Sequence, residues 1–159
     1  MLNINLDKIT DLDFKTKEAY KTLRTNVQFC GNDVKIISLT SCVPNEGKSM
    51  VSFNLAISMA ETGKKVLFID ADLRKSVLIG RYKINKAIKG LTQYLSGVEQ
   101  LDDVRYSTNV KNMDLILSGP VPPNPAELLN NEKFTELLET ARKEYDYVII
   151  DTPPIGQVI

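Results

Sequence analysis

The stretch from residue 34 to residue 60 constrains the fold more than any other part of the chain. It opens with the β-rich run VKIISLT, continues through the loop SCVPNEGKS at positions 41–49, and closes with apolar residues at helical spacing: Phe53, Ala56, Ile57 and Ala60. The triplet GKS matches the end of the phosphate-binding pattern G-x-x-x-x-G-K-[ST], although Cys42 replaces its first glycine. The order of strand, loop and helix favours a phosphate site over a chance turn before an amphipathic helix.

The residue types at the end of this loop suit contact with phosphate. A glycine at position 47 lets the backbone approach a phosphate closely. The N–H groups of residues 46–49 lie near a helix N-terminus, which carries about half a positive charge. We expect Lys48 to bridge the β and γ phosphates of a nucleotide, and the Ser49 hydroxyl to bind Mg²⁺. The expected nucleotide-binding residues are Pro44, Asn45, Glu46, Gly47, Lys48, Ser49 and Met50.

Carboxylates end two apolar runs that have the pattern of buried strands. KVLFID ends at Asp70 and is followed by Ala71 and Asp72, and YVIID ends at Asp151. A carboxylate in such a place is costly unless it is paired or binds a metal, and the ends of parallel strands meet beside the phosphate loop. Asp70 and Asp72 face the same side if extended, so one can bind Mg²⁺ while the other accepts a proton from an attacking hydroxyl. For any single aspartate, a helix cap or a loop start is a competing interpretation.

The rest of the chain alternates strands with helices. Further strands are expected at 113–117 and 147–151, and helices at 15–29, at 91–95 and from Pro125 to Ala141. This alternation predicts an α/β fold, a P-loop NTPase-like parallel β-sheet flanked by helices on both faces. We expect a single domain over residues 1–159, in which residues 1–14 form a loose N-terminal arm.

Composition excludes several classes of function. Lys+Arg and Asp+Glu both number 20, so the formal net charge is zero, which argues against a nucleic-acid partner. The chain has no histidine and two cysteines, Cys30 and Cys42, so a structural zinc site is not expected and a reducing, cytoplasmic compartment fits. No run approaches the ~18 apolar residues of a membrane span.

Five segments together carry a family resemblance: EAYKTLRTN, SCVPNEGKS, VLFIDADLR, SGPVPPNPAELL and YVIIDTPP. In these segments the chain resembles the bacterial tyrosine kinases (BY-kinases) that regulate capsular and exopolysaccharide synthesis, from about residue 16 to residue 159. The resemblance implies that Asp70 is the base for a tyrosine hydroxyl and that the metal ligands are Ser49, Asp72 and Asp151. The implied catalytic residues are Lys48, Asp70 and Asp72.

The same resemblance implies an activity and partners. The activity is transfer of the γ-phosphoryl group of ATP to protein tyrosines with Mg²⁺, leaving ADP, between subunits of a homo-oligomeric ring. The ring would use the stripe Glu18, Lys21 and Arg24, in which Lys21 replaces the usual arginine of the family. A transmembrane activator of the polysaccharide co-polymerase type would hold the protein at the inner face of the cell membrane. Family members are longer, so the C-terminal part of the family domain, with more strands and a tyrosine-rich tail, is absent from this chain.

Other functions stay open on the sequence alone. Partition and septum-site ATPases of the ParA/MinD type share the expected fold, but their loops carry an extra lysine where this chain has Val43. An ATPase switch of that kind, or a nucleotide-gated assembly scaffold, is the alternative to a kinase. The stripe of Glu18, Lys21 and Arg24 has the alternative interpretation of a solvated charged face.

Overall fold

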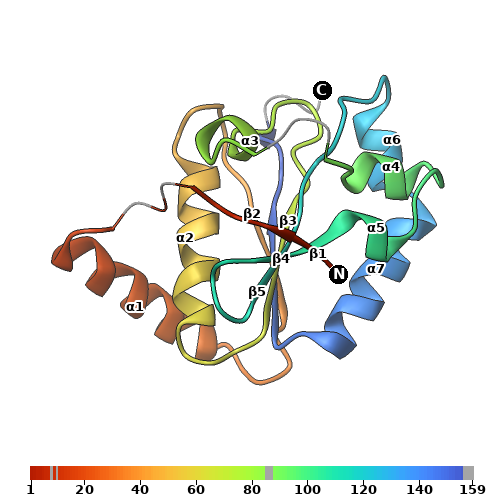
Figure 1. The fold of residues 1–159 in the computed structure, drawn as a ribbon. Coiled ribbons are helices and arrows are strands. Elements are labelled where there is room, and N and C mark those ends of the chain that lie inside the picture. Colours follow the sequence, from red (N-terminus) through yellow and green to blue (C-terminus); the bar gives the residue numbers. More distant parts are fainter. Residues whose placement is uncertain (8, 10, 85–87, 156–159) are drawn as a thin grey trace.

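The computed structural model describes residues 1–7, 9, 11–84 and 88–155. Its helices and strands (Figure 1) follow in the order β1 (Leu2–Ile4), α1 (Phe14–Gln28), β2 (Ile36–Leu39), α2 (Lys48–Ala60), β3 (Val66–Asp70), α3 (Leu78–Arg81), α4 (Leu91–Leu95), α5 (Leu101–Val104), β4 (Arg105–Thr108), β5 (Met113–Ile116), α6 (Pro125–Leu129), α7 (Glu132–Glu144) and β6 (Tyr147–Asp151). Within the described ranges, no helix combines the length and the apolar character that crossing a bilayer requires.

The described strands form one six-stranded sheet in the order β1-β4-β5-β3-β6-β2. Neighbouring strands are parallel except β4 and β5, which are antiparallel. Only residues 109–112 connect β4 to β5, which is too short for the crossover that a parallel pair needs. The predicted α/β fold is confirmed, with a sheet that is predominantly rather than wholly parallel.

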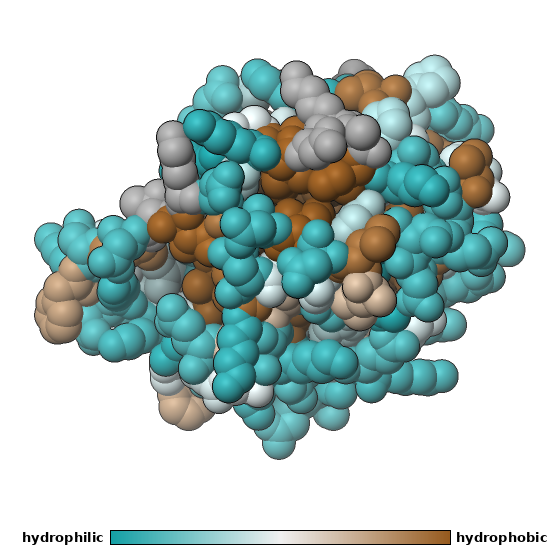
Figure 2. Space-filling model, in the orientation of Figure 1, coloured by the Kyte–Doolittle hydropathy of each residue, from teal (hydrophilic) through white to brown (hydrophobic). Residues whose placement is uncertain are grey.

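Helices cover both faces of the sheet, and the residues of β3 alternate between two apolar clusters (Figure 1). On one face Phe68 packs edge-to-face on Phe53 of α2, with ring centroids 5.2 Å apart. On the other face Leu67 and Ile69 join Leu137 of α7. Hydrophobic side chains also gather in the middle of the face seen in Figure 2, with hydrophilic residues around them. Because both faces of the central strands are covered, their ends are where polar chemistry can be placed.

The prediction of a loose arm over residues 1–14 is wrong for its first part. Leu2–Ile4 forms β1, which pairs in parallel with β4 at the edge of the sheet. Ile4 and Leu6 are buried in the cluster on the α2 face, and the Leu6 N–H donates to the Asn109 side-chain oxygen at 2.8 Å. Residues 8 and 10 of the arm lie outside the described residues. A three-residue strand is too short for its alternation to be recognised in the sequence.

Two helices differ from the sequence prediction. The helix expected from Pro125 to Ala141 is divided into α6 and α7, because the Asn131 side chain accepts the Lys133 N–H at 2.6 Å and caps a new helix. Helix α1 has bounds within a residue of the prediction, yet none of its residues is buried. Its apolar stripe therefore contributes little to the core of this chain.

Candidate functional site

The loop from Ser41 to Ser49 joins the end of β2 to the start of α2. Gly47 is the N-cap residue of α2 and has a φ of 84°, a left-handed conformation that glycine adopts without a steric penalty. In the part of the chain that the structure describes, no group accepts a hydrogen bond from the backbone N–H groups of Asn45 to Ser49. Free N–H groups at a helix N-terminus suit anionic oxygen atoms. The loop therefore has the features that a phosphate requires, even with Cys42 in place of a glycine.

Lys48 and Ser49 both contact the end of β6. The Lys48 ammonium forms an ion pair with one Asp151 carboxylate oxygen, and the Ser49 hydroxyl donates to the other at 2.6 Å. These contacts arise because β2 and β6 are neighbours, with Leu39 level with Asp151. Both side chains of the ion pair are more than nine-tenths buried. The structure thus brings together three residues that the sequence predicts from segments about a hundred residues apart.

Asp70 lies beside Asp151, because β3 and β6 are neighbours and these two residues are level in the register. Its side chain is buried, and its two oxygens accept from the Ser76 hydroxyl at 2.5 Å and from the Asp72 N–H at 3.2 Å. Burial, together with the negative charge of Asp151, raises the pKa of Asp70 to about 7 against the lowering effect of the Ser76 hydrogen bond. A buried carboxyl with a pKa near neutrality is suited to accept a proton.

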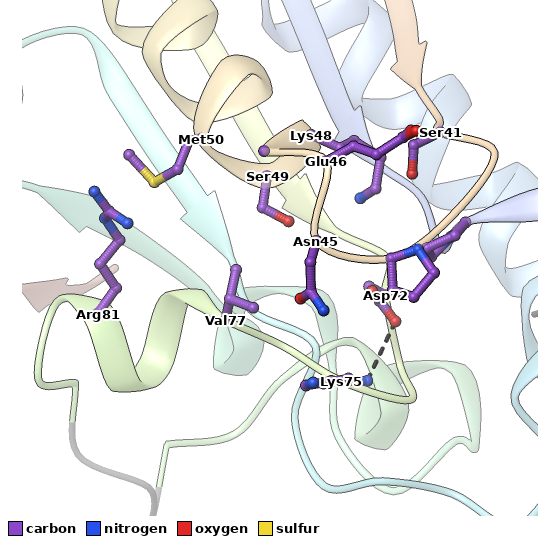
Figure 3. A pocket seen from close by; sticks show the side chains of 13 residues that line it. Ser41, Asn45, Glu46, Lys48, Ser49, Met50, Asp72, Lys75, Val77 and Arg81 are labelled. Atoms are coloured by element: carbon purple, nitrogen blue, oxygen red, sulfur yellow. Dashed lines mark hydrogen bonds between the residues drawn. The ribbon is translucent and has the colours of Figure 1, made fainter.

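A cavity of about 300 Å³ lies between the phosphate loop and the segment after β3 (Figure 3). Residues of the loop form one wall, and Asp72, Lys75, Val77 and Arg81 lie across from them. All seven residues expected to bind the nucleotide line this cavity. Asp72 also lines it, and its carboxylate accepts the Lys75 N–H at 3.2 Å.

The sequence did not predict five of the lining residues: Ser41, Lys75, Val77, Arg81 and Pro154. Their signal is weak, because the segment after β3 has neither a periodic pattern nor a motif with a known partner. The basic residues that follow the carboxylates at the end of β3 are the one feature that points to Lys75 and Arg81. Lys75 and Arg81 add positive charge to the wall opposite the loop.

The oxygen donors at the site fit a magnesium ion. Within the described residues, no three His, Cys, Asp or Glu side chains form a ready metal cage. The available donors are the Ser49 hydroxyl and the carboxylates of Asp72 and Asp151. Mg²⁺ commonly keeps several waters and uses one or two carboxylates together with phosphate oxygens, so this donor set is compatible with it. The role of each donor as a ligand stays a prediction.

The three residues expected to build a ring make contacts within the chain. The Lys21 ammonium pairs with the Glu18 carboxylate at 2.9 Å on the exposed surface of α1. The Arg24 guanidinium instead donates to the Ser58 carbonyl oxygen at 2.7 Å and to the Ser58 hydroxyl at 3.1 Å. Arg24 therefore anchors α1 to α2, and any contact with a neighbouring subunit would compete with this anchor.

The fold and the site define a nucleotide-binding domain of the P-loop class. A family model described as "AAA domain" matches residues 34–159, and the chain belongs to this AAA domain family. The match begins near β2 and includes the phosphate loop, the segment after β3 and the end of β6, which together form the site.

Within that class, the chain is similar to bacterial tyrosine kinases, as the resemblance predicts. Tyrosine-protein kinase CpsD of Streptococcus agalactiae is 49% identical over 145 residues, which are 91% of this chain and 63% of that protein. The kinase domain of the Escherichia coli tyrosine kinase ETK has a TM-score of 0.88 and 37% identity, covering 99% of this chain and 62% of that one. The septum site-determining protein MinD complexed with Mg-ADP, from Pyrococcus horikoshii, has a TM-score of 0.64 and 29% identity, covering 76% of this chain and 49% of that one. The chain spans less than two thirds of the length of each.

Proposed function

We propose that this chain is the nucleotide-binding part of a protein-tyrosine kinase that uses Mg-ATP. The observation that carries the proposal is the grouping of Lys48, Ser49, Asp70 and Asp151 at the carboxyl ends of two neighbouring strands, beside the cavity of the phosphate loop. The similarity to CpsD and to the ETK kinase domain, both named tyrosine kinases, supports the same activity.

Nucleotide binding would use groups that already surround the cavity. The free N–H groups of Asn45 to Ser49 would donate hydrogen bonds to phosphate oxygens, and Lys48 would exchange its Asp151 contact for the β and γ phosphates. A magnesium ion held by Ser49, Asp72 and Asp151 would neutralise phosphate charge and orient the nucleotide. The ion pair between Lys48 and Asp151 keeps the buried lysine neutralised until a phosphate competes for it.

The transfer step needs a base near the acceptor hydroxyl. The tyrosine oxygen would form a bond to the γ-phosphorus while the bond from that phosphorus to the β–γ bridging oxygen breaks. ADP would leave with the electron pair of that bond, and the hydroxyl proton would pass to Asp70. Asp70 suits this role because it is buried and has a pKa of about 7.

The setting of the reaction is also part of the proposal. The likeness to bacterial tyrosine kinases favours a cytoplasmic protein held at the inner face of the membrane by a transmembrane activator. It also favours a homo-oligomer in which one subunit phosphorylates the next, and a role in capsular or exopolysaccharide synthesis. A ParA/MinD-like ATPase switch has less support, because the MinD likeness covers 76% of this chain at a TM-score of 0.64.

The proposed activity is tested by incubating the full-length protein with Mg-ATP and probing it for phosphotyrosine by immunoblot. Lys48→Met and Asp70→Asn should each abolish the signal, because one removes the phosphate contact and the other the proton acceptor. Lys111→Met, at an exposed position away from the cavity, is the matched control and should keep the signal. Circular dichroism verifies that each variant is folded. An undiminished signal in Lys48→Met would defeat the mechanism, and phosphate release without phosphotyrosine would favour an ATPase switch.

A further inference from the structure

A second cavity, of about 500 Å³, adjoins the segment that follows β3. It shares Lys75 with the nucleotide cavity, so the two spaces meet along this segment. Ser76 lines the second cavity and donates its hydroxyl to Asp70 at 2.5 Å. The proposed proton acceptor is therefore one hydrogen bond away from a space that the nucleotide does not need.

The walls of this cavity combine apolar surface with positive charge. Its apolar residues include Leu73, Ile79 and Val121, and its charged residues are Arg74 and Lys75. Among the described residues that line it, none is acidic. An aromatic ring suits the apolar part, and anionic groups suit the rim that bears Arg74 and Lys75.

The far wall of the cavity, at Ser118 and Gly119, is firmly attached to the start of α4. The Ser118 carbonyl oxygen accepts from both the N–H and the hydroxyl of Thr92, at 3.0 and 2.9 Å. A Cβ added at Gly90 would lie 2.4 Å from the Gly119 nitrogen, so the two backbones are in direct contact. A wall held in this way gives the cavity a fixed shape before any ligand enters.

We propose that the second cavity binds the acceptor tyrosine of a peptide whose neighbouring residues are acidic. This rests on the proposed kinase function and adds a substrate class to it. The tyrosine hydroxyl takes the place of the Ser76 hydroxyl at Asp70, and the flanking carboxylates meet Arg74 and Lys75. The phosphoryl transfer is the one described above, with ATP as the donor.

Four of the six tyrosines of this chain are held in its core and are not available as the acceptor. Tyr82, Tyr94, Tyr106 and Tyr145 are buried, with at most 7% of each residue exposed. Tyr82 and Tyr106 also lie in the apolar cluster on the α2 face. A tyrosine on a segment with an extended backbone, either in another protein or in another copy, is the form that can enter the cavity.

The test measures peptide binding by fluorescence anisotropy with the full-length protein, ADP and Mg²⁺. One labelled nonapeptide has a central tyrosine flanked by glutamates, and its counterpart has glutamines. The glutamate peptide should bind about fivefold more tightly, as expected for two partly exposed ion pairs. Val121→Glu and Arg74→Glu, which place negative charge on the cavity wall, should each remove this preference. Lys111→Glu changes the net charge as Arg74→Glu does, at an exposed site outside the cavity, and should retain it.

Equal binding of the two peptides, or equal loss of preference in Lys111→Glu, would overturn the inference. If Arg74→Glu fails to fold, Val121→Glu still tests the inference, because Val121 is 69% exposed and its replacement should not disturb the fold. The immunoblot on the protein's own tyrosines is independent of the added peptides. A positive blot with no peptide preference would leave the kinase proposal standing while the substrate inference fails. A negative blot would count against the kinase proposal itself.

Discussion

At the scale of single residues, the site is a set of charged groups that share partners. Asp151 accepts from both Lys48 and Ser49 and lies beside Asp70 in the sheet. The lysine offsets the charge of Asp151, whereas Asp70 is buried with a raised pKa and favours its neutral form. The two neighbouring carboxyls therefore differ in charge. Asp151 is suited to hold a cation, and Asp70 is suited to hold a proton.

The raised pKa of Asp70 makes stability depend on pH in a definite direction. The folded state keeps the proton up to about pH 7, while the unfolded chain releases it near 3.8. The stabilising contribution is therefore present below about pH 4 and is lost as the pH rises to about 7. Asp70→Asn has no proton to lose, so between pH 5 and pH 8 its stability relative to wild type should increase by roughly 2–3 kcal/mol.

Urea denaturation in EDTA without nucleotide measures this difference at the two pH values. Asp33→Asn is the control, because it removes an exposed carboxylate. Its stability relative to wild type should not change comparably between pH 5 and pH 8. A constant offset between Asp70→Asn and wild type at both pH values would mean that Asp70 is ionised in the folded protein throughout.

At the scale of elements, close backbone contact holds the loop after β5 against the start of α4. The Leu91 N–H donates to the Leu117 carbonyl oxygen at 2.7 Å, and Gly90 and Gly119 are packed together. Gly90 has an extended backbone, with φ −145°, so its requirement for glycine is one of space rather than of conformation. This contact fixes one wall of the second cavity.

Gly90→Ala should lower the free energy of unfolding by about 2–3 kcal/mol, because its Cβ would fall within 2.6 Å of backbone atoms of Gly119 and Leu117. Gly80→Ala is the matched control, since nothing lies within 4 Å of a Cβ there and Gly80 is part of α3. It should be neutral or slightly stabilising. Chemical denaturation measures the free energy of unfolding of both variants. If Gly90→Ala is as stable as Gly80→Ala, the loop after β5 can move away from the added methyl group without cost.

The N-terminal segment, residues 1–7, contains one buried and one exposed leucine that can be compared. Leu6 is 3% exposed and Leu2 is 58% exposed. Leu6→Ala should destabilise the protein by about 2–4 kcal/mol, whereas Leu2→Ala should stay within about 0.5 kcal/mol of wild type. Thermal or urea unfolding measures the stability of the two variants. Similar values would restore the interpretation of this segment as a loose arm.

Elements with a strong apolar pattern were predictable from the sequence, and very short strands without one were not. Apolar runs gave the bounds of β6 correctly and those of β3 within a residue, and the glycines on either side gave the bounds of α4. β1 and β4 escaped prediction because runs of three and four residues, LNI and RYST, are too short to have a period that can be recognised. The residues of the phosphate site follow from their motifs, but the partner Ser76 does not, since only the folded chain brings its hydroxyl to Asp70.

At the scale of the whole molecule, α1 is attached to the rest more weakly than the other long helices. It has no buried residue, while α2 buries seven and α7 two. Its apolar stripe remains partly exposed, with Leu23 at 37%. Its packing partner is α2, to which Arg24 adds a hydrogen bond.

Amide hydrogen exchange should report this difference directly. In dilute protein, the amides in the middle of α1 should exchange at least about tenfold faster than those in the middle of α2, because helix opening there exposes little buried surface. At high concentration with Mg-nucleotide, slower exchange confined to α1 would support subunit contacts through Glu18 and Lys21. Light scattering that shows only monomer under those conditions would count against a ring.

The position of β2 at the outer edge of the sheet has a consequence for the solubility of this chain. In the described part of the chain, β2 has a strand neighbour on one side only, namely β6. Its sequence IISL is short, β-prone and free of charge, and an open edge of that kind invites strand-to-strand stacking between separate molecules. We therefore expect concentrated solutions of this chain to precipitate by the same backbone pairing that builds its sheet, and a lysine at position 38 to oppose it.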